Sequence, residues 1–183
     1  LEAEAAPQDR AFIHRVQTGR PWGLLKWAMS LDGRTALPNG ESQWISAPPA
    51  RGWVHQLRAG CDAVIVGGGT VRADNPLLTS RGLRSPEPLR VVLSRSLDLP
   101  AQAQLWETSL APTLLAYGPV VDRPCPEGPE TLKLLASEPL DLLHVLADRG
   151  CNRVLWECGP ALAAAALRQG CVQEVGVGVA PQL

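Results

Sequence analysis

The stretch Asp62-Ala63-Val64-Ile65-Val66-Gly67-Gly68-Gly69-Thr70-Val71-Arg72-Ala73-Asp74-Asn75-Pro76 decides the fold that we expect for this chain. Ala63 to Val66 is a short apolar run that is typical of a buried strand. The three glycines that follow let the backbone turn sharply and approach a ligand without a Cβ in the way. Thr70 and Asp74 come next, and two interpretations stay open: a strand-to-helix connection with a polar cap, or side chains that face a ligand. A dinucleotide-binding fingerprint fits poorly, because Arg72 stands where that motif needs its third glycine.

Composition limits the classes of protein to consider. The 183 residues, 45% of them hydrophobic, are enough for one domain with its own core. The net charge of −1 gives no basis for a nucleic-acid or membrane surface, so a local cluster of basic groups must hold any anionic ligand. There is no apolar run of membrane-spanning length and no secretion signal, which makes the cytoplasm the expected location. Because the chain starts at Leu1 and not at Met, we expect a processed chain or a piece of a longer one.

The cysteines are odd in number and have no Cys-x-x-Cys spacing; they are Cys61, Cys125, Cys151, Cys158 and Cys171. This pattern disfavours both a disulfide framework and a tetrahedral zinc site. We therefore expect reduced thiols and no metal.

An internal regularity predicts the architecture. Three segments share the order of a helix end, a glycine in the left-handed conformation, a cysteine and then a strand: Arg58-Ala59-Gly60-Cys61, Asp148-Arg149-Gly150-Cys151 and Arg168-Gln169-Gly170-Cys171. Three helix-to-strand junctions indicate a mostly parallel sheet with helices on its faces, an α/β fold. The three cysteines then serve as small core residues.

The remaining elements follow from periodicity and turn residues. Residues 1–19 are expected to form a linker and a short helix over 10–18, and residues 20–183 a single domain. Strands are predicted over 22–29, 63–66, 89–93, 113–117, 154–156 and 175–179, a long loop over 30–42 and coil over 118–129. Helices are predicted over 141–149 and 161–169, and a further helix begins around Pro48-Pro49 and runs over 50–59. Lys26, inside the first strand, is either solvated at a sheet edge or faces a ligand in a cleft.

Two polar features follow the strand that ends at Trp156. Glu157 stands at a carboxyl strand end, where open α/β sheets bind ligands, although a cap-like carboxylate beside a helix start is an equal alternative. Gly159 and Pro160 begin the next helix, and its amino terminus is a ready site for a phosphate.

Five motifs, in order, resemble the reductase domain of the bifunctional riboflavin-biosynthesis deaminase/reductase. They are Lys26-x-Ala28-x-Ser30-Leu31-Asp32-Gly33-Arg34, Gly40-Glu41-Ser42-Gln43-Trp44-Ile45-Ser46, Leu57-Arg58-Ala59, Gly69-Thr70-Val71-x-Ala73-Asp74-Asn75-Pro76-x-Leu78-Thr79-x-Arg81 and Glu157-x-Gly159-Pro160. The resemblance implies a dihydrofolate-reductase-like fold. It also implies NADPH-dependent reduction of the ribosyl group of 5-amino-6-(5-phosphoribosylamino)uracil to the ribityl chain.

The same resemblance implies roles for particular residues. It places NADPH at Ala28, Trp44, Thr70, Asp74, Ser94 and the turn that includes Gly159, Pro160, Ala161 and Leu162. It places the phosphorylated pyrimidine at Lys26, Ser42, Arg58, Leu78, Arg81 and Glu157, with Lys26, Asp74 and Glu157 as the catalytic set. For any single arginine, a solvated helix surface is the competing interpretation.

Departures from the family pattern qualify these expectations. Cys158 stands where the family usually has glycine or alanine, and the chain stops at Leu183, before the family's last strand, so we expect an incomplete sheet. The zinc-deaminase signature of the partner domain does not occur, which places deamination in a fused or upstream domain. A homodimer is the family expectation. Three alternatives stay open: reduction of the amino-bearing pyrimidine, a dihydrofolate-type reductase, and a non-catalytic nucleotide-binding domain that regulates a partner.

Overall fold

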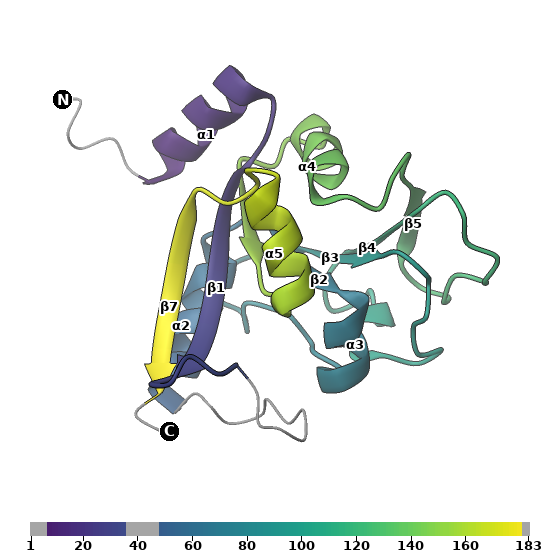
Figure 1. The fold of residues 1–183 in the computed structure, drawn as a ribbon, viewed down its shortest axis with the longest axis horizontal. Helices are drawn as coiled ribbons and strands as arrows, with labels where there is room; N and C mark the ends of the chain where they lie inside the picture. The colour runs from purple at the N-terminus through teal and green to yellow at the C-terminus, as the bar shows by residue number, and fades with distance from the viewer. Residues whose placement is uncertain (1–6, 36–47, 181–183) are drawn as a thin grey trace.

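A single sheet forms the centre of the computed structural model, which describes residues 7–35 and 48–180 (Figure 1). Its seven strands lie in the order β5-β4-β3-β2-β6-β1-β7, and every pairing is parallel. The strands are β1 (Trp22–Ser30), β2 (Ala63–Gly67), β3 (Leu89–Ser94), β4 (Thr113–Tyr117), β5 (Glu130–Lys133), β6 (Arg153–Trp156) and β7 (Glu174–Ala180). The predicted parallel sheet is therefore confirmed, and all carboxyl strand ends meet at one edge.

Helices cover both faces of the sheet. On one face α4 (Pro139–Asp148) and α5 (Pro160–Arg168) pack on alternate residues of the central strands, such as Ile65 and Val91. On the other face α2 (Pro48–Ala59) and α3 (Gly68–Asp74) pack on the intervening residues, such as Val64 and Val92. Figure 1 shows α5 in front of the sheet and α2 behind it, while α1 (Pro7–Thr18) lies beside the start of β1. The two clusters are the hydrophobic core, as the alternation of strand residues dictates.

The three helix-to-strand junctions differ in one detail from the prediction. Gly150 and Gly170 have φ values of 86° and 64°, as expected for a left-handed cap. Gly60 does not have a positive φ, so the prediction was wrong there; its N–H donates to the carbonyl of Gln56 at 3.0 Å and extends the helical pattern by one residue. All three junction cysteines are buried, and burial raises the pKa of Cys61 to about 12.

The stretch from Asp62 to Pro76 forms β2 and α3 with no loop between them. Gly67 is the amino-terminal cap of α3 and receives no side-chain hydrogen bond, so Thr70 is not the cap that one interpretation allowed. Asn75, with φ of 41°, ends the helix in the left-handed conformation. At the opposite end of β2 the Asp62 carboxylate accepts hydrogen bonds from the N–H groups of Asn152 (2.8 Å) and Arg153 (3.0 Å) and thus joins β2 to β6.

Element boundaries shift by one to three residues, mostly at prolines. Pro48, Pro139 and Pro160 each begin a helix, because a proline in the first turn gives up no intrahelical hydrogen bond. Two short elements were not predicted: β5 and a 3₁₀ turn, η2, over Gln104–Trp106. The short helix α3 was allowed by only one of the two interpretations of the glycine stretch, without bounds. The coil over 118–129 is confirmed, whereas residues 36–42 of the predicted loop lie outside the described part of the chain.

Across residues 7–35 and 48–180, the model contains no helix that is both long and apolar enough to cross a membrane.

Candidate active site

A cavity of about 1060 Å³ lies at the carboxyl edge of the sheet, between the ends of β1, β2, β3 and β6 and the starts of α3 and α5. This is where a parallel α/β sheet binds ligands. Most of the described residues expected to act in the site line this cavity: Lys26, Ala28, Thr70, Asp74, Leu78, Ser94, Glu157, Gly159, Pro160, Ala161 and Leu162. Arg58 and Arg81 are not among the lining residues, and Ser42 and Trp44 lie outside the described residues.

Glu157 is held by an ion pair that sequence spacing could not reveal. Arg58, at the end of α2, donates from Nε to Oε2 at 2.9 Å and from Nη2 to Oε1 at 2.7 Å. Its third donor, Nη1, reaches the carbonyl of Thr79 at 2.9 Å. Only 12% of the Arg58 side chain and 16% of the Glu157 side chain are exposed, so solvent screens the pair weakly. Glu157 therefore presents a fixed carboxylate at the cavity and does not cap α5, whose cap residue is Gly159.

Lys26 lies on β1, whose residues pair with β6 as far as Leu25, and Lys26 itself pairs with Gly176 of β7. The edge strand on this side is β7, so Lys26 does not lie on an edge strand. Its side chain is half-buried and lines the cavity at the carboxyl half of β1. A primary ammonium in this position can donate hydrogen bonds to an oxygen-rich ligand.

Arg81 stands at the tip of an exposed turn that Glu87 organises. The Glu87 carboxylate accepts hydrogen bonds from the N–H groups of Ser80 (2.6 Å) and Gly82 (3.1 Å), the residues on either side of Arg81. Burial alone would raise the pKa of Glu87, but these two donors, together with the Ser80 hydroxyl and the charge of Arg58, outweigh it and the pKa is lowered. The turn thus holds the Arg81 backbone at φ of 60°.

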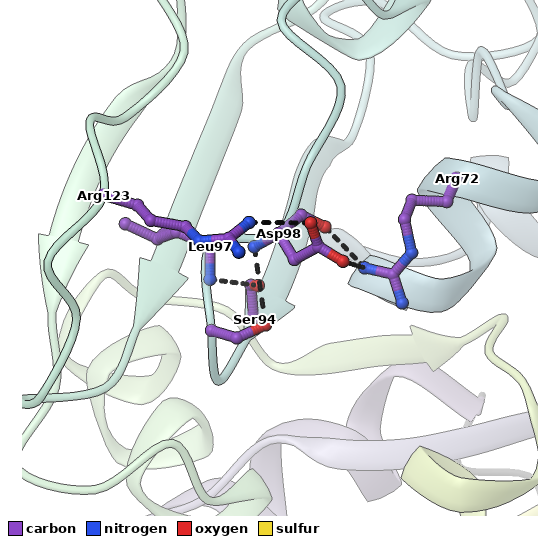
Figure 2. Close-up of polar contacts among 6 residues, drawn as sticks. Arg72, Ser94, Leu97, Asp98 and Arg123 are labelled. Carbon is purple, nitrogen blue, oxygen red and sulfur yellow. Dashed lines mark hydrogen bonds and ion pairs between the residues drawn. The ribbon is translucent and has the colours of Figure 1, made fainter.

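A group of arginines surrounds the loop that follows β3. Asp98 pairs with Arg123 at 2.7 Å and with Arg72 at 3.5 Å, and Figure 2 shows the two arginines on opposite sides of it. The buried Ser94 hydroxyl accepts a hydrogen bond from the Leu97 N–H at 3.1 Å, which leaves its own O–H to donate. Arg72 and Ser94 line the cavity, as does the exposed Arg95. This corner of the cavity is therefore basic.

Two glycines leave room at the opposite walls of the cavity. A Cβ added at Gly69 or at Gly159 would meet no heavy atom within 4 Å, so the backbone of each faces open space. Gly159 leads into α5, whose first backbone N–H groups have no intrahelical partner. Cys158, beside it, is half-buried, and burial raises the pKa of its thiol to about 12, so the thiol stays protonated at neutral pH.

The comparisons with known proteins agree with this geometry. The family model for the RibD C-terminal domain matches residues 21–183. This chain belongs to the RibD C-terminal domain family. Its relatives include the riboflavin biosynthesis protein RibD of Synechocystis sp., which is 46% identical over 100% of this chain and 51% of its own length.

Solved structures of RibD proteins have the same fold. Acinetobacter baumannii RibD superposes with a TM-score of 0.81 at 35% identity, over 96% of this chain and 50% of that one. A Thermotoga maritima protein described as a diaminohydroxyphosphoribosylaminopyrimidine deaminase/5-amino-6-(5-phosphoribosylamino)uracil reductase superposes with a TM-score of 0.81 at 30% identity, over 95% and 48% of the two chains. The expected dihydrofolate-reductase-like fold is thereby confirmed, and the chain spans about half the length of these relatives.

Several residues of this RibD-type site were missed by sequence reasoning. Arg72, Asp98 and Arg123 carried no motif that would connect them, since their contacts span 25 and 26 residues. Arg72 was noted only as the residue that spoils a glycine motif. In the described residues no group of three potential ligands could hold a metal ion.

Proposed function

We propose that this chain reduces the ribosyl group of 5-amino-6-(5-phosphoribosylamino)uracil to the ribityl chain, with NADPH as the reductant. The observation that carries the proposal is that residues from the substrate motifs and residues from the cofactor motifs line the same cavity. Lys26, Leu78 and Glu157 lie on it from the substrate motifs, and Ser94 and the Gly159 turn lie on it from the cofactor motifs. The name of the Thermotoga maritima relative, at 30% identity, points to the same reaction.

The walls of the cavity suit a nicotinamide cofactor. Gly69 and Gly159 leave space for a ligand against the backbone, and the amino end of α5 favours a negatively charged pyrophosphate. When bound, the cofactor supplies the hydride. The residues of the chain then have to bind and orient the cofactor and the substrate, and to exclude water.

We propose NADPH and not NADH because of the basic corner of the cavity, of which Figure 2 shows Arg72, Ser94, Asp98 and Arg123. Arg72, Arg95 and Arg123 carry three positive charges against the one negative charge of Asp98, next to the Ser94 hydroxyl. A 2′-phosphate placed here gains charge-assisted hydrogen bonds of about 1.5–3 kcal/mol, or roughly 10- to 150-fold in affinity.

The substrate side has a division of tasks among four residues. Opening of the ribosylamine ring gives an imine at C1′, which accepts a hydride at carbon and a proton at nitrogen. Lys26 and Glu157 face the opened sugar, Lys26 as a hydrogen-bond donor and Glu157 as an acceptor that orients the hydroxyl groups. Arg58 acts through Glu157, because each of its three nitrogens already donates a hydrogen bond to Glu157 or Thr79, and Arg81 receives the 5′-phosphate.

Asp74 is proposed to orient the riboses at the end of α3 and to form no covalent bond to the substrate. It lines the cavity beside Leu78, within reach of both ligand regions. Asp74→Ala should lower kcat/KM with the fold intact. Trapping of a covalent enzyme–substrate adduct at Asp74 or Glu157 contradicts the assignment.

The test is NADPH oxidation with the deaminated and the amino-bearing phosphoribosylaminopyrimidine side by side, and with dihydrofolate as a third substrate. We expect turnover of the deaminated pyrimidine. Turnover of only the amino-bearing compound changes the substrate, turnover of dihydrofolate alone changes the reductase class, and binding of NADPH without any turnover favours a regulatory domain.

Two finer expectations complete the proposal, a cytoplasmic location and a homodimer. Strand β7 lies at one edge of the sheet and exposes Val175, Val177 and Val179 by about half. A second copy of the chain would cover this apolar face. Light scattering of the purified protein tests it, and a monomer at micromolar concentration contradicts it. Deaminase activity is assigned to a fused domain, in line with the name of the Thermotoga maritima relative.

A further inference from the structure

Arg90, in β3, is the one charged residue that is buried among those whose burial the structure describes, with 0% exposed. Its guanidinium donates to four backbone carbonyls: Nη1 to Leu77 (3.3 Å) and Gln104 (3.4 Å), and Nη2 to Glu107 (2.8 Å) and Ala111 (2.7 Å). A buried charge is costly unless its donors are satisfied; both terminal nitrogens of Arg90 have partners, whereas its buried Nε–H has none among the described residues. Arg90 therefore joins two segments that are far apart in the sequence, the loop after α3 and the segment around η2.

A second link joins the same two segments. The Gln104 N–H donates to Oδ1 of Asn75 at 2.9 Å, and Nε2 of Gln104 donates to the Asn75 carbonyl at 2.8 Å. Gln104 is thus hydrogen-bonded to both the side chain and the backbone of Asn75. Together with Arg90 it fixes the loop at its first and third residues.

This loop, residues 75–81, which we call the site loop, has an unusual backbone. Asn75, Leu78 and Arg81 all have positive φ values, of 41°, 58° and 60°. Asn tolerates this conformation, but Leu and Arg do not favour it. Such a backbone persists only where the surroundings impose it, and strained residues of this kind cluster at functional sites.

The other side of the site loop faces the cavity and the ion pair. Leu78 is buried and lines the cavity, and the Thr79 carbonyl accepts the third hydrogen bond of Arg58, which holds Glu157. Arg90, Asn75 and Gln104 are not among the lining residues. A displacement of the site loop would therefore move Leu78 and loosen Arg58, which holds Glu157.

We propose that Arg90 and the Asn75–Gln104 pair are positioning residues of the reductase, which hold the site loop so that Leu78 and the Arg58–Glu157 pair face the substrate. This inference rests on the proposed function. It concerns residues that touch neither ligand and act only through the loop.

Asn75 is the residue to change, because removal of the fully buried Arg90 threatens the fold itself. Asn75→Gly deletes the side-chain acceptor of the Gln104 N–H, leaves the backbone carbonyl and keeps a backbone that permits positive φ. Asn75→Asp keeps an oxygen for the Gln104 N–H and serves as the conservative rescue. Gln102→Ala is the matched control, because Gln102 is exposed in the same segment and takes part in neither link.

Two measurements are made on each variant. The first is steady-state kinetics with NADPH and 5-amino-6-(5-phosphoribosylamino)uracil, together with NADPH affinity by fluorescence titration. We expect Asn75→Gly to lower kcat/KM by at least about 10-fold, since small misplacements of a site cost up to about 100-fold, with NADPH affinity within about twofold of wild type. Asn75→Asp should recover most of the loss, and Gln102→Ala should show none.

The second measurement, amide hydrogen exchange over residues 75–81, does not need activity. Exchange should accelerate in Asn75→Gly and stay unchanged in Gln102→Ala. Unchanged exchange in Asn75→Gly overturns the inference. Faster exchange with a normal kcat/KM also overturns it, and so does a loss of NADPH affinity as large as the loss in kcat/KM. If the wild type turns over no substrate, the proposed function fails, and the holding of the site loop is still decided by exchange.

Discussion

Removal of Arg58 should reveal whether this arginine reads the phosphate of the substrate or holds Glu157. Exposed ion pairs contribute about 0–1 kcal/mol, whereas breaking a buried pair costs about 3–5 kcal/mol. With side chains 12% and 16% exposed and two short contacts, this pair lies nearer the buried limit. We expect Arg58→Ala to lower the free energy of unfolding by about 2–3 kcal/mol, because it leaves the Glu157 carboxylate and the Thr79 carbonyl without their donor.

Urea denaturation at pH 7 measures this loss, with Gln56→Ala on the exposed side of the same helix as the control. Combining Arg58→Ala with Glu157→Ala should show a coupling energy of about 1–2 kcal/mol. Arg58→Lys should recover less than half of the loss, since an ammonium cannot form the two parallel hydrogen bonds.

Kinetics separate the two roles. If Arg58 acts through Glu157, Arg58→Ala and Glu157→Gln lower kcat/KM by a similar factor on phosphorylated and dephosphorylated substrates alike, and their effects do not add. Arg81→Ala should instead reduce the preference for the phosphorylated substrate, at a cost of about 1.5–3 kcal/mol. Our reasoning is refuted if Arg58→Ala abolishes the phosphate preference while Glu157→Gln preserves it.

Further predictions concern the cofactor, acid stability and packing. Arg72→Ala combined with Arg95→Ala should bring the NADPH:NADH ratio of kcat/KM, expected at about 10- to 150-fold in the wild type, close to one, and an unchanged ratio contradicts the assignment of the 2′-phosphate. Because the folded-state pKa of Glu87 is lowered, its stabilisation is present at neutral pH and is lost as the pH falls through that pKa, below the ordinary 4.5. The difference in Tm between wild type and Glu87→Gln should therefore shrink in acid, and a constant difference from pH 7 to pH 3 contradicts the role of the carboxylate. A Cβ at Gly23 would lie 2.0 Å from the Cys171 carbonyl oxygen, so Gly23→Ala should cost about 3 kcal/mol or more, whereas Gly69→Ala should leave Tm unchanged and weaken cofactor binding. Equal Tm values for the two variants count against this picture.

The sequence predicted the sheet well because its signals are local. The strands at 63–66, 113–117 and 154–156 are each a short apolar run bounded by turn residues or a helix end, so they were placed within a residue. Strand β5 was missed because Glu-Thr-Leu-Lys has no apolar run, and it pairs only with β4 at the edge. The left-handed conformation predicted for Gly60 was wrong because a helix can continue through glycine. The local sequence does not decide in which direction the chain leaves the helix.

The site was predicted as a set of residues but not as a set of contacts. Parallel strands bring Lys26, Ser94 and Glu157 to one edge, which the order of the elements already indicates. The Arg58–Glu157 pair spans 99 residues, and no spacing rule connects the two side chains. Arg90 appears in the sequence as a polar interruption of a strand, and only the tertiary structure shows which carbonyls surround it.

The Asp62 carboxylate, at the edge of the sheet far from the cavity, has a consequence for the geometry of catalysis. It fixes the register of β2 against β6, in which Ile65 lies opposite Trp156. Gly67 ends β2 and Glu157 follows β6, so their relative height above the sheet is set from its opposite end. In the proposed reaction, the alignment of hydride donor and acceptor thus depends on a residue about 17 Å of strand away, at roughly 3.3 Å per residue from Asp62 to the end of β2. Mutagenesis that is confined to the residues lining the cavity would therefore not change the strand register that Asp62 sets.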